Sequence, residues 1–119
     1  MPHPVVHFEV IGRDGAKLQA FYRDAFDWAI DASNPMNYGL VDTGDDGGIA
    51  GGIASGDEPQ ATFYVSVDDP AATLEKIKGL GGKVVQDVTV IPGMVTMALI
   101  EDPEGNRIGI VASEPPPAE

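Results

Sequence analysis

A short internal repeat constrains the fold of this chain more than any other feature of its sequence. Residues 7–10 (HFEV) match residues 62–65 (TFYV), which lie 55 positions further along a chain of 119 residues. With one inserted residue, two apolar positions of the first half also align with two of the second: Leu18 and Phe21 with Leu74 and Ile77. The two halves are therefore expected to share one order of elements.

Hydrophobic periodicity and turn residues predict that shared order. In the first half, the patterns predict strands over 5–11, 28–31, 38–42 and 48–53, with a helix that opens at Asp14-Gly15. In the second half, they predict strands over 61–67, 83–90, 94–100 and 107–112, with a helix from Asp69-Pro70 to Gly81-Gly82. We expect an α+β fold of two βαβββ repeats, residues 5–55 and 60–112, whose curved mixed sheets have their helices outside.

These repeats are predicted to form one domain over residues 1–112. The tail, residues 113–119, contains three consecutive prolines and is expected to be disordered. The helical spacing predicts which side chains of each helix face its sheet. For the first helix these are Leu18, Phe21, Tyr22, Ala25 and Phe26, and for the second Leu74, Ile77 and Leu80.

Composition excludes several kinds of function. The chain has no cysteine, which rules out disulfides, thiolate metal sites and cysteine nucleophiles. Its formal net charge of −12 repels phosphate backbones, so nucleic acid is not an expected partner. No apolar run is long enough to cross a membrane. The N-terminal residues have neither the basic region nor the apolar stretch of a signal peptide, and a cytoplasmic location is expected.

The alternation of the strands predicts a polar face on each sheet. Phe8 and Val10, with Phe63 and Val65 of the second repeat, are the apolar set and should cover the helices. The opposite face then receives His7, Glu9, Thr62 and Tyr64. Polar residues on a concave sheet face suggest a site for a ligand, on which Tyr38 and Tyr64 are placed to stack. Alternatively, His7 is a hydrogen-bonded sheet residue, Glu9 is a solvated or Arg-paired residue at the rim, and both tyrosines pack at the rim.

The glycine-rich strand over residues 48–53 is a separate signal. Missing side chains suggest the close approach of another backbone or of a ligand. We expect this strand to lie at a sheet edge, where a strand with so few side chains is a pairing liability. We therefore expect a homodimer in which a second copy covers it.

Five segments together resemble the vicinal oxygen chelate superfamily, which includes glyoxalases, bleomycin-resistance proteins and extradiol dioxygenases. They are residues 5–10 (VVHFEV), 20–28 (AFYRDAFDW), 66–69 (SVDD), 80–84 (LGGKV) and 101–108 (EDPEGNRI). The resemblance extends over nearly the whole chain up to Ala112. It implies the paired βαβββ fold, a dimer in most members, and a ligand cleft in each sheet.

In the metal-dependent members of that superfamily, His or Glu side chains at four strand positions hold a divalent ion. His7 occupies the first of these positions, but the others fall on Thr62, on Gly109 and on the strand 48–53, which has no carboxylate or imidazole. Asp45, Asp46 and Asp57 lie only in the turns beside that strand. His7 is then the one remaining ligand position, and no metal or other cofactor is predicted. A divalent metal would need an irregular site that includes Glu9.

The leading hypothesis is a metal-independent protein that binds a small molecule through His7, Glu9, Tyr38, Thr62 and Tyr64. A net charge of −12 would attract cationic ligands. The alternative is an enzyme of the lyase, isomerase or dioxygenase type, with His7 and Glu9 as its acid/base pair. A third hypothesis is an interaction module without a ligand.

Overall fold

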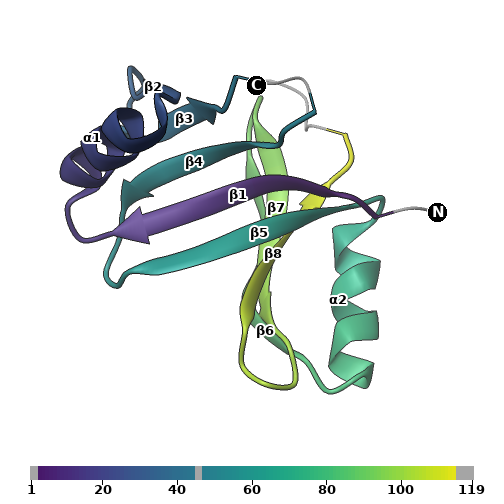
Figure 1. Ribbon diagram of the computed structural model, residues 1–119. Coiled ribbons are helices and arrows are strands. Elements are labelled where there is room, and N and C mark those ends of the chain that lie inside the picture. The colour runs from purple at the N-terminus through teal and green to yellow at the C-terminus, as the bar shows by residue number, and fades with distance from the viewer. Residues whose placement is uncertain (1–2, 45–46, 115–119) are drawn as a thin grey trace. The chain divides into compact units, whose positions relative to one another are not determined.

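The computed structural model describes residues 3–44 and 47–114, which form two compact units (Figure 1). The N-terminal unit is Val6–Phe63, and the C-terminal unit comprises the described parts of Met1–Val5 and Tyr64–Glu119. Each unit contains a mixed four-stranded sheet and one helix, as expected from the repeat. The α+β fold of two βαβββ units is therefore confirmed. Asp45, Asp46 and residues 115–119 lie outside the described residues.

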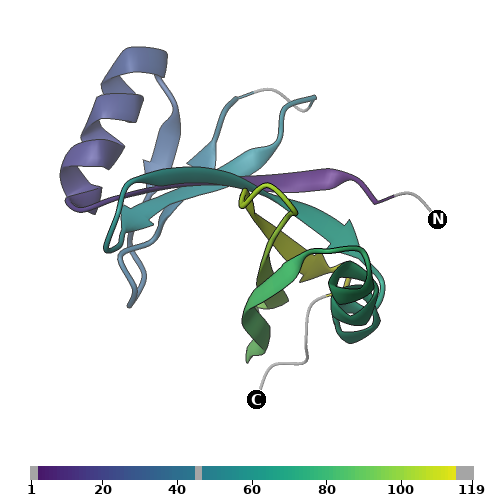
Figure 2. The same ribbon diagram turned by 90° about the horizontal axis from the view of Figure 1, so that it is seen from below.

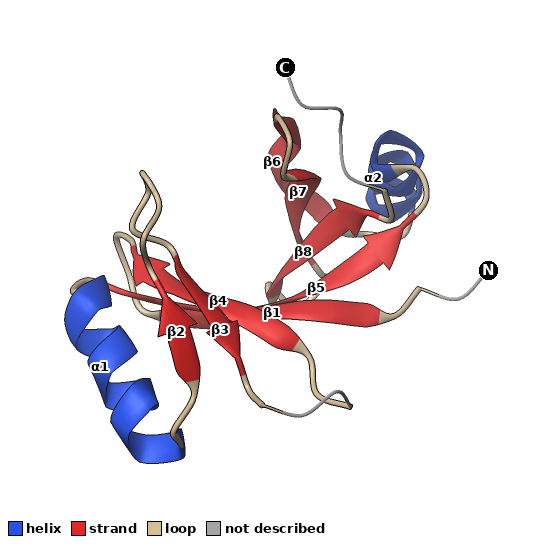
Figure 3. Ribbon diagram, turned by 90° about the horizontal axis from the view of Figure 1, so that it is seen from above, coloured by secondary structure: helices blue, strands red, loops and turns tan. Residues whose placement is uncertain are grey.

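The N-terminal unit contains β1 (Val5–Gly12), α1 (Gly15–Phe26), β2 (Ala29–Asp31), β3 (Gly39–Asp42) and β4 (Ala50–Ser55), in the sheet order β2-β3-β4-β1 (Figure 3). β4 is parallel to β1 and antiparallel to β3. The prediction that the glycine-rich strand is a sheet edge is therefore wrong. After β1 and α1, the chain forms β2 at the sheet edge and then β3. β4 follows and lies between β3 and β1. Both sides of β4 are paired by strands of its own unit.

Helix α1 begins where the Asp14 side chain accepts a hydrogen bond from the Lys17 N–H. It ends at Asp27, whose φ of 59° is left-handed. The buried helix residues are Gly15 and Gln19. Phe21 and Phe26 are 59% and 57% exposed, so the predicted inward face of this helix is only partly right.

An aromatic cluster explains where these side chains pack. The rings of Tyr22 and Phe26 have their centroids 5.7 and 5.2 Å from that of Trp28, and Phe8 of β1 reaches the same indole at 5.6 Å. This places Phe8 on the sheet face that carries α1, as expected. The cluster stabilises the helix edge while leaving Phe26 largely in water, because its ring needs only one side to contact the indole.

The C-terminal unit contains the part of β5 (Gln60–Val67) from Tyr64 onward, α2 (Pro70–Gly79), β6 (Lys83–Ile91), β7 (Val95–Glu101) and β8 (Arg107–Ala112), in the sheet order β5-β8-β7-β6. Helix α2 packs along β6, β7 and β8 (Figure 2). The buried core between helix and sheet is Val67, Leu74, Ala98, Ile100 and Ile110. Val65, Ile77 and Ile108 pack against it, which confirms the predicted direction of Val65 and Ile77.

Leu80, Phe63 and Ser113 each differ from what the sequence predicts. Leu80 caps the end of α2 and is 69% exposed, so it does not extend the apolar face of the helix. Phe63, at the end of the N-terminal unit, is 41% exposed instead of joining a core. Ser113, predicted to be disordered, donates hydrogen bonds from its N–H to the Val67 carbonyl and from its hydroxyl to Asp68. Within residues 3–44 and 47–114, neither helix has the length and apolar surface of a membrane-spanning helix.

Candidate functional site

A tyrosine hydroxyl joins His7 and Glu9 on the face of the N-terminal sheet opposite α1. The Tyr38 Oη donates a hydrogen bond to Glu9 Oε2 at 2.9 Å. The same oxygen lies 2.9 Å from His7 Nε2. The His7 and Tyr38 rings are close to parallel, with an interplanar angle of 16°. All three residues are half-buried, so the contacts form a partly enclosed polar site.

The sheet positions this group through alternation and through one glycine. His7 and Glu9 are two residues apart on β1 and therefore face the same side. On β4, Gly52 pairs with Glu9, and the Tyr38 ring lies over Gly52 in the volume that a side chain there would occupy. The close approach predicted from the glycines thus involves an aromatic side chain of the same chain, not a backbone or a ligand. Gly51 similarly leaves room for the Phe8 ring on the opposite face.

The loop before β3 holds Tyr38 in place. Asn34 Oδ1 accepts a hydrogen bond from the Tyr38 N–H at 3.0 Å, and Asn34 Nδ2 donates to the Tyr38 carbonyl at 2.7 Å. The residue before it, Asn37, has a φ of 53°, a left-handed value that asparagine tolerates better than most residues. Both ends of the Tyr38 residue are therefore fixed, the backbone by Asn34 and the hydroxyl by His7 and Glu9.

The hydrogen-bond directions define the protonation of the imidazole. Since the Tyr38 hydrogen goes to Glu9, the His7 Nε2–H donates to the Tyr38 oxygen, and Nδ1 remains as an acceptor. Burial lowers the pKa of His7 from its ordinary value of 6.5, with the charge of Glu9 acting in the opposite direction to a smaller extent. The lowered pKa favours the neutral imidazole. The result is a directed chain of hydrogen bonds from His7 through Tyr38 to Glu9.

The other two predicted site residues are both buried. Thr62 lies in the N-terminal unit, on the part of β5 that precedes the unit boundary. Tyr64 lies in the C-terminal unit, where it pairs with Gly109 of β8 and its ring occupies the volume of a side chain at that position. The structure thus brings together His7, Glu9 and Tyr38. Among the described residues, a tyrosine ring takes the place of a glycine's missing side chain once in each unit, at Gly52 and at Gly109.

The side chains present do not fit the divalent ion that the superfamily's metal-dependent members hold. A metal site in a protein needs about three or more side-chain donors. Within the described ranges, no three or more His, Asp or Glu side chains gather in a way that could hold an ion. A carboxylate at position 109 would have to displace the Tyr64 ring. His7 and Glu9 supply two donors, and Tyr38 already bonds to both.

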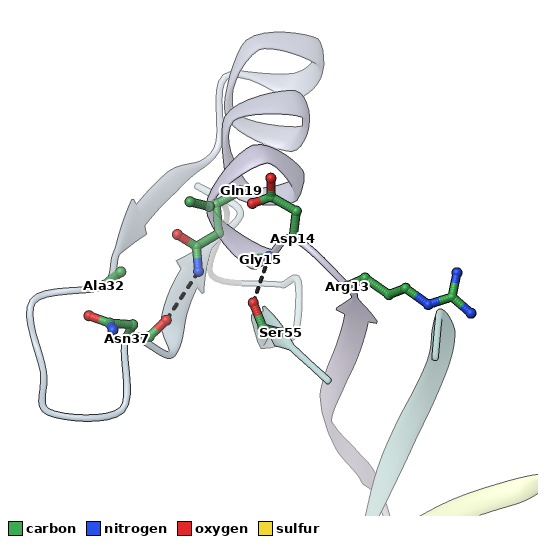
Figure 4. Close-up of a pocket in the computed structure, with 8 residues that line it drawn as sticks. Arg13, Asp14, Gly15, Gln19, Ala32, Asn37 and Ser55 are labelled. Carbon is green, nitrogen blue, oxygen red and sulfur yellow. Dashed lines mark hydrogen bonds between the residues drawn. The ribbon is translucent and has the colours of Figure 1, made fainter. Parts of the chain in front are cut away.

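A hollow on the α1 side of the N-terminal unit was not predicted from the sequence (Figure 4). Its volume is about 460 Å³, and it lies between the first turns of α1, the end of β4 and the loop that joins β2 to β3. Gln19, Asn37 and Ser55 are among the residues that line it. The one available signal was Gln19, a polar residue beside apolar positions of the predicted helix face.

Comparison with known proteins shows the family. The model of the Glyoxalase/Bleomycin resistance protein/Dioxygenase superfamily matches residues 5–110. The chain belongs to this superfamily, which confirms the resemblance inferred from its motifs. A glyoxylase-like domain-containing protein of Didymella fabae is 30% identical over 112 residues, covering 86% of this chain and 88% of that protein.

Solved structures share the fold at low sequence identity. A methylmalonyl-CoA epimerase from Mycobacterium tuberculosis superposes with a TM-score of 0.67 at 15% identity, covering 93% of this chain and 88% of the other. A superfamily member from Vibrio splendidus 12B01 gives a TM-score of 0.64 at 14% identity, covering 93% and 98%. At this level of identity the likeness establishes the architecture, and function has to be argued from the site.

Proposed function

We propose that this protein binds a small organic molecule, without a metal ion, on the sheet face that carries His7, Glu9 and Tyr38. The observation that carries the proposal is the Tyr38 hydroxyl held between His7 and Glu9 at 2.9 Å from each. Half-buried polar groups cost free energy unless they are hydrogen-bonded. A sheet face that needed only stability would be served by apolar side chains. A bonded polar set in its place points to recognition of a ligand.

The acceptors on this face indicate the chemistry of the ligand. A carboxylate has about four acceptor sites, so Glu9 can accept more than the hydrogen bond from Tyr38, and the ligand is expected to carry donors. The net charge of −12 adds a long-range attraction for cations. A basic molecule with a planar portion fits both features. Thr62, in the same unit, remains a proposed contact of this ligand, and Tyr64 remains a proposed ligand contact within its own unit.

A thermal-shift screen of cationic, neutral and anionic planar compounds tests this proposal. Cationic compounds are expected to raise the melting temperature, because a ligand that binds only the folded state stabilises it. The shift should shrink in the Glu9→Gln variant. The matched control is Glu58→Gln, an exposed glutamate in the same unit. Equal shifts in both variants, or no shift with any compound, would contradict binding at this face.

A second candidate is an acid/base enzyme, which the directed chain of hydrogen bonds favours. A half-buried His7 that Tyr38 orients through Nε2 is suited to accept a proton from a carbon next to a carbonyl group. The chain through Tyr38 to Glu9 would then stabilise the positive charge on the imidazole. Exchange of such a carbon-bound proton for solvent deuterium, followed by NMR on a panel of carbonyl compounds, separates this candidate from binding alone. Exchange that persists in His7→Gln would count against it.

We also propose that the protein is a cytoplasmic homodimer, although β4 cannot be the surface involved, since both of its sides are paired. The exposed aromatic rings of Phe21 and Phe26 on α1 are the better candidates for a surface that a second copy covers. Light scattering should find a mass near twice 12.5 kDa at micromolar concentration. Replacing both rings by serine should produce the monomer. A wild-type monomer would refute the dimer.

A further inference from the structure

The hollow at the start of α1 contains a buried amide whose oxygen is not used by the protein. Gln19 is only 7% exposed. Its Nε2 donates to the Ile53 carbonyl at 2.7 Å and to the Asn37 carbonyl at 3.3 Å. Both partners are carbonyl oxygens, so this end of the amide has to be the nitrogen. The opposite end, Oε1, is then an acceptor whose orientation is determined.

Gln19 is one of the residues that line the hollow. We infer that its oxygen reaches the hollow. It accepts no hydrogen bond from any residue in 3–44 or 47–114. In the same ranges, every fully buried side-chain oxygen or nitrogen has a partner. Gln19 Oε1 therefore keeps some contact with its surroundings even though the residue as a whole is buried. That contact is through the hollow that Gln19 lines.

The charges around the hollow favour a cation over an anion. Asp14 lines it and uses one carboxylate oxygen, Oδ1, to accept from the Lys17 N–H at 3.1 Å. The Gly15 N–H, which would otherwise attract an anion, donates to the Ser55 hydroxyl at 2.7 Å. The Arg13 side chain points away from Gln19 and donates to the Asp57 carbonyl (Figure 4). Among the groups that line the hollow, the Gln19 amide oxygen and the Asp14 carboxylate are acceptors, beside the side chains of Arg13, Asn37 and Ser55.

We propose that this hollow binds a small primary ammonium group, which donates hydrogen bonds to Gln19 Oε1 and to the Asp14 carboxylate. An ammonium group has three donors and no acceptor, which matches the two acceptors on offer. A volume of about 460 Å³ accommodates an amine of a few carbon atoms. This site lies on the α1 face of the sheet and does not depend on the function proposed for the His7 face.

The test is a titration followed by ¹H–¹⁵N NMR with methylammonium, and with tetramethylammonium as a cation that has no N–H donor. Methylammonium is expected to shift the Gln19 side-chain amide and the Gly15 backbone amide saturably, at roughly millimolar concentration. Tetramethylammonium should not. Shifts that grow linearly without saturation, or equal responses to the two cations, would overturn the site and indicate weak attraction to a negatively charged protein.

Two variants locate the binding. Asp14→Ser removes the carboxylate but keeps a residue able to cap the helix, and it should weaken methylammonium binding by at least about fivefold. Ala32→Leu fills the hollow from the β2–β3 loop and should abolish the shift of the Gln19 amide. Asp24→Ser, an exposed acid on the same helix, is the control for charge alone. If Asp14→Ser and Asp24→Ser weaken binding equally, the site is wrong.

Discussion

The ring of Tyr38 occupies the volume that a side chain at Gly52 would need. This relationship between the loop before β3 and the middle of β4 decides the chemistry of the face. It lays the phenol across the sheet and carries its hydroxyl to both His7 and Glu9. The absence of one Cβ atom is therefore a condition for the hydrogen-bond chain.

Replacing Gly52 by alanine should separate Tyr38 from both partners. The added methyl group overlaps the Tyr38 ring, which must leave the sheet face. We expect a loss of about 1–3 kcal/mol in the free energy of unfolding, from the strain and from the lost hydrogen bonds. The His7 imidazole resonances should change at the same time. Gly79→Ala is the control, because a Cβ there meets nothing and the helix should gain up to about 1 kcal/mol.

Removing the Tyr38 hydroxyl with Tyr38→Phe tests the chain without disturbing the packing of the ring. The variant loses two hydrogen bonds to half-buried partners, which should cost about 1–2 kcal/mol of unfolding free energy. Urea denaturation measures the change. In the Gly52→Ala variant, Tyr38→Phe should lower the free energy of unfolding much less, because the hydrogen bonds of the hydroxyl are already broken. Additive costs would show that Tyr38 does not depend on Gly52.

Glu9→Gln should separate stability from binding. A glutamine oxygen can still accept the Tyr38 hydrogen bond, so the variant is expected to be neutral or slightly more stable than the wild type. Loss of the negative charge should weaken the binding of a cationic ligand found in the screen by at least about tenfold, or roughly 1.4 kcal/mol of binding free energy. A paired thermal melt and ligand titration checks both. Strong destabilisation with unchanged binding would make Glu9 a structural residue.

Divalent metals should leave the melting temperature essentially unchanged. His7 and Glu9 supply two donors, and Tyr38 bonds to each. Among the described residues, Ni²⁺, Zn²⁺ or Mn²⁺ would find no group of three His, Asp or Glu ligands. Metal analysis of the purified protein and melts with and without a chelator measure this. A rise of several degrees with one metal that His7→Ala abolishes would reverse the conclusion.

The hairpin turn at Asp102 should contribute stability that depends on pH. Hydrogen bonds from the Asn106 side chain and backbone lower the pKa of Asp102 below its ordinary value of 3.8. The contribution is therefore fully present above the unfolded pKa of about 4 and is lost as the pH falls through the lower folded value. In the Asp102→Asn variant, the free energy of unfolding, measured by urea denaturation at several pH values, should fall less steeply below about pH 4. Asp24→Asn, an exposed acid in α1, should leave that slope unchanged.

Local patterns in the sequence were enough to determine the elements and the direction of their side chains. The caps at Asp14 and Asp69 begin the two helices where the motifs placed them, because a capping side chain bonds to an N–H only three residues away. Alternation put His7 and Glu9 on one face, since a strand sends every second side chain to the same side. The repeat and the family motifs depend on the same short-range order.

Only the tertiary structure decided how distant segments meet. The sequence could not show that β4 lies between β1 and β3, because strand order depends on the path the chain takes after α1. Nor could it show that Tyr38, 29 residues from Glu9, would bond to it, or that Gly52 makes the space. The sequence likewise could not show that Gln19 would be buried, because its side chain donates hydrogen bonds to the distant carbonyl groups of Asn37 and Ile53. Each of these contacts requires the packed sheet, and no periodicity within one segment encodes them.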